Sequence, residues 1–383
     1  MIDRMQLGEV PDKPHTVFRD RAGRLRYEEC LTRAGFDGEY SILYHEGPPM
    51  TDREIGPADP GPFDRRVPIP ASHVPLKRRL LLGEKAPPGW TPVLDSPDVT
   101  ASLFHLPPGA VGDEGFSNGD GDDLLYLFSG RGTLETPFGD VPAEGGDYVL
   151  VPRGVVHRWR IEEDLRGIGF ELKGGFHLPT QFRNPVGQLR MDAPFTHRDF
   201  RRPRFSGPRP GPATVLVKKG GRFVRRVPLA SPFGVVGWDG TVWPFAFPIL
   251  RFQPKTGLVH LPPTIHGTFA GRGVLVCSFV PRVTDTHPDA IPCPYPHASV
   301  DCDEVIYYVR GNFTSRKGVG PQAVSLHPAG IPHGPHPGAY EASIGTRATD
   351  ELAVMMDTFL PLSLTEQALD LELAGYHDSW VPA

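Results

Sequence analysis

The stretch P-H-A-S-V-D-C-D-E-V-I-Y-Y-V-R-G-N-F, residues 296–313, with V-S-L-H-P-A-G-I-P-H-G-P-H, residues 324–336, decides the fold of this 383-residue chain. The apolar run 305–309, closed by Gly311, predicts a buried strand and a turn. A second short strand, residues 323–326, precedes the next turn. Two such strands, paired, would hold the side chains between them on a rigid β framework.

Three side chains of this stretch are candidate metal ligands. Two neutral imidazoles and one carboxylate, here His297, His333 and Glu304, are the ligand set of a non-haem Fe(II) site with open positions. A single histidine is more often a surface or core residue than a ligand. Seven of the histidines nevertheless lie in residues 260–336, and this concentration favours a metal site.

Composition favours a mainly β protein. The chain contains 44 glycines and 45 prolines together with 39% hydrophobic residues, a combination that indicates many short strands joined by tight turns. The net charge is −5, without long blocks of like charge. Nucleic acid and an anionic membrane are therefore not expected as partners, whereas a small molecule is.

The cysteines and the N-terminal residues indicate the expected cellular location. The four cysteines are scattered without a C-x-x-C pair, which predicts neither a disulfide framework nor a thiolate metal site; they are Cys30, Cys277, Cys293 and Cys302. The first ten residues have no apolar core of signal-peptide length, and no window is apolar enough for a membrane span. The sequence therefore predicts a cytoplasmic protein.

The first half of the chain contains a series of alternating apolar runs from about residue 100 onwards. Glycine-bearing turns separate them, as a small antiparallel barrel requires. The runs are residues 99–104, 124–128, 132–136 and 147–151.

Two segments of this half resemble the sequence motifs of cupin barrels. G-D-Y-V-L-V-P-R-G-V-V-H, ending in His157, resembles the second motif, and the spacing from Asp123 to Gly130 resembles the first. Phe116 and Asn118 stand where the first motif has two histidines. We therefore expect this barrel to be structural and free of metal.

The second half repeats the first. Glu304 to Gly311 has the spacing of Asp123 to Gly130, and the turn that ends in His333 matches the turn that ends in His157. The predicted fold is therefore mainly β, a bicupin of two double-stranded β-helix barrels. An N-terminal extension and a metal-free barrel would occupy residues 1–245, and the catalytic barrel residues 246–383.

A short C-terminal helix is expected beyond the second barrel. Ser363-Leu-Thr-Glu366 has the form of a capping box, which predicts a helix over residues 364–373 that ends near Gly375.

Several segments together resemble homogentisate 1,2-dioxygenases, over nearly the whole chain. They are P-F-G-V-V-G-W-D-G at 232–240, P-P-T-I-H-G-T-F at 262–269, Y-P-H at 295–297, R-G at 310–311, S-L-H at 325–327 and P-H-G-P at 332–335. The resemblance implies Fe(2+) bound by His297, Glu304 and His333, with His266 as the acid/base histidine. It also implies trimers or hexamers.

The sequence departs from that family at three places. The interval from His297 to Glu304 is one residue longer than usual, so Asp303 is an alternative carboxylate ligand. Asn312-Phe313 replaces the family's usual His-Tyr, and Arg316 replaces a lysine. An arginine pairs with a carboxylate through two N–H groups, which lysine does not.

The expected substrate contacts come from the same region. They are Tyr295, Phe313, Arg316, His327 and His333.

These features predict an Fe(2+)-dependent dioxygenase that opens the ring of a para-hydroquinone bearing a carboxylate, homogentisate or a close analogue, with O2 as co-substrate. Two alternatives remain from the sequence. One is a cupin metalloenzyme with isomerase-like chemistry, and the other is a non-catalytic bicupin that binds an aromatic acid.

Overall fold

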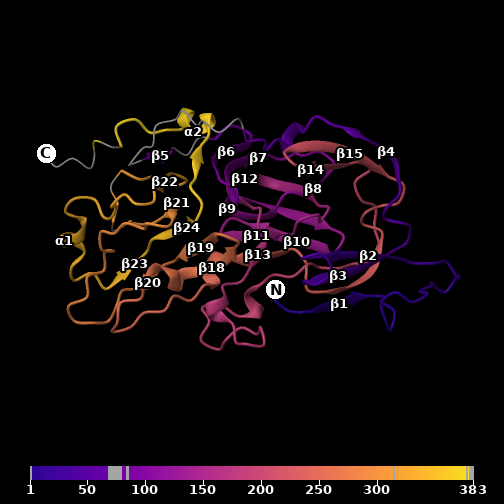
Figure 1. The fold of residues 1–383 in the computed structure, drawn as a ribbon, viewed down its shortest axis with the longest axis horizontal. Coiled ribbons are helices and arrows are strands. Elements are labelled where there is room, and N and C mark those ends of the chain that lie inside the picture. The colour runs from indigo at the N-terminus through magenta and orange to yellow at the C-terminus, as the bar shows by residue number, and fades with distance from the viewer. Residues whose placement is uncertain are drawn as a thin grey trace.

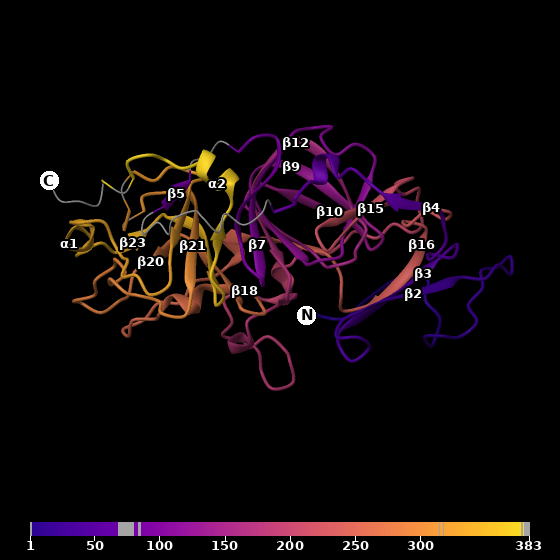
Figure 2. The same cartoon turned by 45° about the horizontal axis from the view of Figure 1, so that its top comes forward.

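The computed structural model describes residues 2–67, 80–82, 86–313, 315–316, 318–376 and 378. The chain is mainly β and elongated, with a separate N-terminal sheet at one end and the barrel of the C-terminal half at the other (Figures 1 and 2). The barrel of the first half lies between them. The predicted mainly β bicupin is therefore confirmed.

The first barrel combines a large sheet with a smaller one. The large sheet runs in the order β17 (Phe245–Pro248), β11 (Asp147–Val151), β9 (Asp122–Thr136), β12 (Arg158–Leu172), β7 (Val99–Leu106), β6 (Gly89–Asp95) and β25 (Ser363–Leu364), with β10 (Gly139–Glu144) paired to β9. The smaller sheet runs β4 (Asp52–Pro57), β15 (Arg222–Pro228), β14 (Val215–Lys219) and β8 (Gly115–Asn118).

The second barrel is built on one seven-stranded sheet. Its order is β13 (Phe176–His177), β18 (Gly267–Gly271), β19 (Val274–Phe279), β24 (Leu352–Thr358), β21 (Asp303–Arg310), β22 (Val324–His327) and β5 (Leu80–Leu82). A two-stranded sheet, β20 (Arg282–Val283) with β23 (Ala348–Thr349), lies at its side.

The N-terminal extension forms its own sheet, together with one strand from the middle of the chain. The order is β1 (Met5–Gly8), β16 (Val235–Gly240), β3 (Tyr40–His45) and β2 (Tyr27–Thr32). The helices are short: α1 (Ala339–Ser343), α2 (Glu366–Asp370) and the 3-10 turns Gly61–Phe63, Thr180–Phe182, His197–Asp199, Ile249–Arg251 and Pro263–His266.

The two barrels exchange strands. β5, from the first half of the sequence, pairs with β22 of the second barrel, and β25, from the C-terminal end, pairs with β6 of the first barrel. β17 pairs with β11 of the first barrel and spans the predicted domain boundary at residues 245 and 246. Each barrel is therefore completed by chain from the other half.

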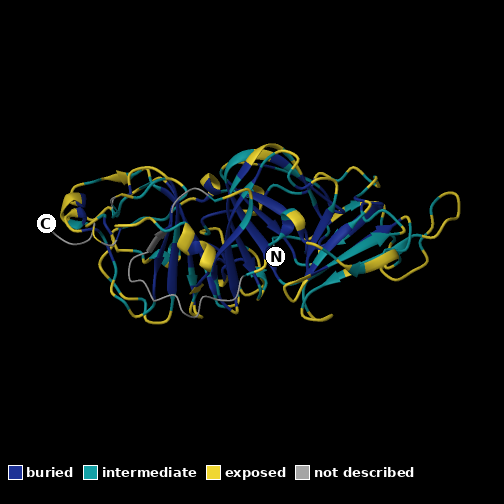
Figure 3. Ribbon diagram, turned by 90° about the horizontal axis from the view of Figure 1, so that it is seen from above, coloured by how far each residue is buried: buried dark blue, intermediate teal, exposed yellow. Residues whose placement is uncertain are grey.

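One hydrophobic core serves both barrels, as the buried strands at the centre of Figure 3 indicate. Tyr148 of β11 packs edge-on against Phe269 of β18, with ring centroids 5.0 Å apart. The Tyr148 hydroxyl lies 2.9 Å from the hydroxyl of Ser278 on β19. Since Tyr148 is completely buried, this hydrogen bond satisfies a polar group that would otherwise be costly to bury.

The predicted internal repeat extends to matching hydrogen bonds. Asp122 accepts from the backbone N–H groups of Arg153 and Phe176, each at 2.6 Å. Asp303, one residue before Glu304, accepts from Ala329 and Leu362, each at 2.7 Å. Arg153 and Ala329 occupy the same place in the two repeated turns, so one carboxylate fixes the equivalent turn in each barrel.

The glycines that end the repeated motif also match. Gly130 and Gly311 have φ angles of +93° and +98°, which favour glycine. The turn predicted at Gly130 is wrong, because β9 continues through it as a single strand of 15 residues. Register shifts in β12 opposite this point let the strand bend there instead of ending.

The C-terminal helix is present, but its predicted start is wrong. Ser363 lies in β25, and the N-cap of α2 is Thr365, whose hydroxyl accepts from the N–H of Ala368. The helix covers five residues rather than ten, because Ser363 and Leu364 pair with β6 instead.

Among the described residues the four cysteines have free thiols, and no helix is long and apolar enough to cross a membrane.

Candidate metal centre

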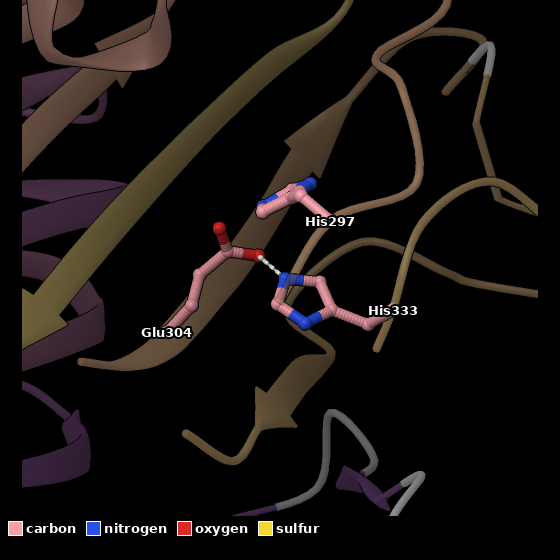
Figure 4. Close-up of side chains that lie close together, drawn as sticks. All are labelled: His297, Glu304 and His333. Atoms are coloured by element: carbon pink, nitrogen blue, oxygen red, sulfur yellow. Dashed lines mark ion pairs between the residues drawn. The ribbon is translucent and has the colours of Figure 1, made fainter. Parts of the chain in front are cut away.

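His297, Glu304 and His333 lie together at one end of the second barrel. One ligand atom from each residue is within 4.8 Å of the others. Figure 4 shows the three side chains pointing toward one another, with His333 Nε2 3.7 Å from Glu304 Oε1. The predicted ligand set therefore forms one cluster.

Backbone pairing sets the two histidines side by side. The N–H of His297 donates to the carbonyl of His333, and the N–H of His333 donates to the carbonyl of His297, both at 2.8 Å. The close approach depends on Gly334, where a Cβ would lie 2.8 Å from the Cα of Pro296. A larger residue at 334 would push the two ligand segments apart.

Each imidazole is oriented by its own loop. Nδ1 of His297 lies 3.0 Å from the carbonyl of Tyr295, and Nδ1 of His333 lies 3.2 Å from that of Ile331. Because Nδ1 donates its proton to a carbonyl, Nε2 is left as an unprotonated acceptor, the form that binds a metal.

One buried nitrogen of the cluster makes no hydrogen bond within the described part of the chain. Nε2 of His333 has no hydrogen bond to any described residue. A buried nitrogen of this kind is satisfied by a bound cation. The donor set of two imidazoles and one carboxylate fits Fe(2+), with coordination positions left open.

Glu304 is held from behind by His327. Nδ1 of His327 lies 2.5 Å from Oε1 of Glu304, and the His327 ring stacks on that of His333 with centroids 4.7 Å apart. Burial lowers the pKa of His327 to about 4, so at neutral pH the ring is uncharged and donates its N–H. Burial by itself raises the pKa of Glu304, but the hydrogen bond from His327 and the nearby imidazole of His333 hold it well below its usual range.

Asp303, the alternative carboxylate, is already occupied. Its two oxygens accept the backbone hydrogen bonds of Ala329 and Leu362 described above. Since neighbouring side chains in a strand point to opposite faces, Asp303 and Glu304 lie on opposite sides of β21. Glu304 is therefore the carboxylate that faces the imidazoles.

The cluster opens onto a pocket of about 190 Å³. His297 and Glu304 are part of its lining. The walls are mostly apolar and include Phe279, Ile306, Phe313, Ala353 and Met355.

Three predicted substrate contacts lie on this pocket: Tyr295, Phe313 and Arg316. Phe313 is buried, and Arg316 donates from Nη1 to the carbonyl of Gly334 at 2.6 Å. His327 is not part of the wall, because it lies behind Glu304. Its predicted contact with substrate is better described as a contact with the carboxylate ligand.

His266, the predicted acid/base residue, lies on the pocket wall. It is buried, its ring is 5.0 Å from that of Phe279, and its Nδ1 has no hydrogen bond to a described residue. Burial, together with the charge of Arg282, lowers the pKa of His266 to about 3. The imidazole is therefore neutral at physiological pH.

The structure adds polar residues that the sequence did not indicate. Nδ1 of His260 lies 3.0 Å from Asp285, and its ring packs against Tyr295 at 5.3 Å. Arg282 lies 2.6 Å from Glu351, and all four line the pocket. A local sequence motif could not have indicated these two pairs, because the two residues of each pair are 25 and 69 positions apart in the sequence.

The first barrel has the same framework with different side chains. Phe116 and His157 exchange two backbone hydrogen bonds of 2.8 and 2.9 Å, as His297 and His333 do. Asp123 follows Phe116 by the same interval that separates Glu304 from His297. In place of an ion, the guanidinium of Arg65 lies 2.8 Å from Asp123 and 5.0 Å from the ring centre of Phe116.

The fold and the cluster define a bicupin with a candidate metal site in its second barrel. A family model described as homogentisate 1,2-dioxygenase N-terminal matches residues 99–249. A protein of Saccharolobus solfataricus named "Putative dioxygenase SSO1533" is 33% identical, with 99% of each chain covered. The chain belongs to the homogentisate 1,2-dioxygenase family.

Other comparisons are more distant. A homogentisate 1,2-dioxygenase of Bradyrhizobium diazoefficiens is 30% identical over 73% of this chain, and the match covers 65% of that enzyme. A cupin barrel protein from Leptotrichia buccalis resembles the chain at 10% identity and a TM-score of 0.34, covering 81% of this chain and 98% of that one.

Proposed function

We propose that the protein is an Fe(2+)-dependent dioxygenase that opens the ring of a para-hydroquinone bearing a carboxylate, homogentisate or a close analogue. The observation that carries this proposal is the cluster of three donor atoms within 4.8 Å of one another. The cluster faces a mostly apolar pocket that is also lined by the cation Arg316. Membership of a dioxygenase family supports it.

The pocket suits a substrate with one aromatic ring. Its volume of about 190 Å³ is small, and the side chains of Phe279, Ile306 and Met355 offer flat or apolar surface to the faces of a ring. Arg316 supplies a permanent positive charge beside Gly334, next to the ligand His333. We assign Arg316 to the carboxylate of the substrate, because a guanidinium binds a carboxylate through two parallel N–H groups.

Proton transfer needs a neutral imidazole near the ring hydroxyl. His266 is neutral at physiological pH and lies on the pocket wall, and we assign it the role of accepting the proton from the ring hydroxyl. His260 is a second imidazole on the same pocket, oriented by Asp285. Bound iron would supply the redox chemistry that lets dioxygen react with a closed-shell aromatic.

The activity is tested with protein reconstituted with ferrous iron. We expect O2 uptake with homogentisate, and smaller or no uptake with gentisate or unsubstituted hydroquinone. Turnover without O2 in protein loaded with Zn(2+) or Mn(2+) would instead indicate isomerase-like chemistry. Absence of O2 uptake with every substituted hydroquinone would reject the proposed activity.

The metal assignment has its own test. His333→Ala should abolish retention of iron, measured by elemental analysis after anaerobic preparation, whereas wild-type protein should hold about one iron per chain, as one three-ligand site predicts. His287→Ala, at an exposed histidine in the same half of the chain, is the matched control. Equal iron in both variants would reject the site.

Kinetic measurements distinguish the roles of His266 and His260. If His266 takes the proton, His266→Gln should lower kcat by a factor of roughly 100 to 10,000, the usual contribution of a general base, with iron retained. His260→Gln is compared in the same assay. A large loss in His260→Gln and none in His266→Gln would transfer the role to His260.

The trimeric or hexameric assembly and the cytoplasmic location remain predictions from the sequence.

A further inference from the structure

The pocket has a polar end formed by Tyr308 and Arg316. Glu304, Ile306 and Tyr308 alternate along β21, so they share one face of the strand, and all three line the pocket. At a rise of about 3.3 Å per residue, the Cα of Tyr308 lies roughly 13 Å along the strand from that of Glu304. The pocket thus follows β21 from Glu304 to Tyr308.

The Tyr308 hydroxyl is held in place by the neighbouring strand. It lies 3.0 Å from the hydroxyl of Ser325 on β22, and Ser325 is completely buried. The Tyr308 ring packs edge-on against Phe313, with centroids 4.7 Å apart. A phenol has one donor and can accept as well, so a bond donated by Ser325 leaves the Tyr308 proton for a ligand.

Charge at this end favours an anion. Burial raises the pKa of Tyr308, and the nearby Arg316 guanidinium offsets part of that increase. The hydroxyl therefore stays protonated at neutral pH and acts as a donor. Arg316 is anchored by its bonds to the carbonyls of Ser315 and Gly334, at 3.1 and 2.6 Å.

β21 and β24 also present apolar side chains to the pocket. Ile306 faces Met355, and Tyr308 faces Ala353 across the β21–β24 ladder. Phe313, at the place where the resembled family usually has tyrosine, contributes only a ring. On this chain the hydroxyl at the polar end therefore comes from the strand residue Tyr308.

We propose that Tyr308, positioned by Ser325, is a specificity-determining residue of this pocket, whose hydroxyl donates a hydrogen bond to the substrate carboxylate that Arg316 binds. This inference rests on the proposed function and extends it. The substrate is a hydroquinone whose acidic substituent lies beside Tyr308 and Arg316.

Binding to zinc-loaded protein tests the inference without turnover. Calorimetry compares homogentisate with methylhydroquinone, which has the same ring but a methyl group in place of the acidic arm. We expect wild-type protein to bind homogentisate more tightly. Tyr308→Phe should weaken homogentisate roughly tenfold to a hundredfold, as expected for loss of a hydrogen bond to a charged group, and leave methylhydroquinone unchanged.

Tyr307→Phe is the matched control. Tyr307 is the neighbouring residue on β21, points to the opposite face, and its buried hydroxyl has no hydrogen bond to a described residue. This variant should bind both compounds as wild type does. Ser325→Ala should weaken homogentisate less than Tyr308→Phe, because it removes only the support of the hydroxyl.

Two results would overturn the inference: wild-type protein that binds the two compounds equally, or Tyr308→Phe that binds homogentisate as wild type does. These results are distinct from failure of the proposed function. If no hydroquinone is cleaved by the iron-loaded protein but homogentisate binding still depends on Tyr308, the activity is rejected and the pocket assignment stands.

Discussion

The Arg65 guanidinium lies 2.8 Å from the Asp123 carboxylate, at the place in the first barrel that corresponds to the ligand cluster of the second. Their side chains are only 7% and 3% exposed, so the pair is buried. Arg65 also stacks on Trp90, with 3.6 Å between the guanidinium carbon and the ring centre. A fixed positive charge thus neutralises Asp123, the residue equivalent to Glu304.

The first prediction concerns this buried pair. Arg65→Met should lower the free energy of unfolding by about 3–5 kcal/mol, because it leaves the Asp123 carboxylate buried without its partner. Urea denaturation measures the change. The double variant Arg65→Met with Asp123→Asn should recover part of the loss, and two losses that simply add would show that the pair is not coupled.

The second prediction concerns His327 and the metal. His327→Leu removes the N–H that holds Glu304 and should weaken metal binding by about 10- to 100-fold, the usual effect of losing a residue that orients a ligand. Competition with a chelator measures the affinity. The urea midpoint of the metal-free variant reports folding separately, and unchanged metal affinity would contradict the prediction.

The third prediction concerns pH and His157. Burial lowers the pKa of His157 to about 4, below its ordinary value of 6.5. Between these values the unfolded chain binds a proton that the folded chain does not, so stability rises with pH there and falls as the solution is acidified. One such group contributes about 1.4 kcal/mol per pH unit.

His157→Gln should therefore reduce the dependence of unfolding free energy on pH between 6.5 and 4.5, measured by urea denaturation of metal-free protein. The exposed His287→Gln serves as the control and should leave the slope unchanged. A His157→Gln variant with the wild-type slope would show that His157 is not buried in its neutral form.

The fourth prediction concerns Thr365. Its buried hydroxyl caps α2 at Ala368 and donates to the carbonyl of Pro92 at 2.7 Å. Thr365→Ala should destabilise the protein by about 1–3 kcal/mol, since it removes a cap and leaves a buried acceptor unpaired. Thermal denaturation measures the loss, and Thr365→Ser, which keeps the hydroxyl, should retain most of the stability.

The candidate ligands could be predicted from the sequence because their signals are local. Glu304 opens an apolar run, and His333 follows a Pro-Ala-Gly turn, so each residue lies at the edge of a recognisable strand. The duplicated spacing identified two barrels for the same reason. The choice between Asp303 and Glu304 required the structure, since it depends on backbone groups at residues 329 and 362.

Other features depend on contacts between distant parts of the chain. Arg65 lies 58 positions before Asp123 in the sequence, in a polar and proline-rich segment without periodicity. His260 meets Asp285 through loop geometry, and neither residue belongs to a strand. The role proposed for Tyr308 has no signal in the sequence, because a tyrosine in an apolar run is normally a core residue.

The strand exchange between the barrels links the candidate metal site to distant parts of the sequence. β5 borders β22, and β22 ends in His327, the residue that holds Glu304. A chain divided between the halves would leave each fragment with a bare sheet edge prone to association. Two co-expressed fragments should therefore bind metal only after they reassemble. Metal binding would then report the association of the two halves.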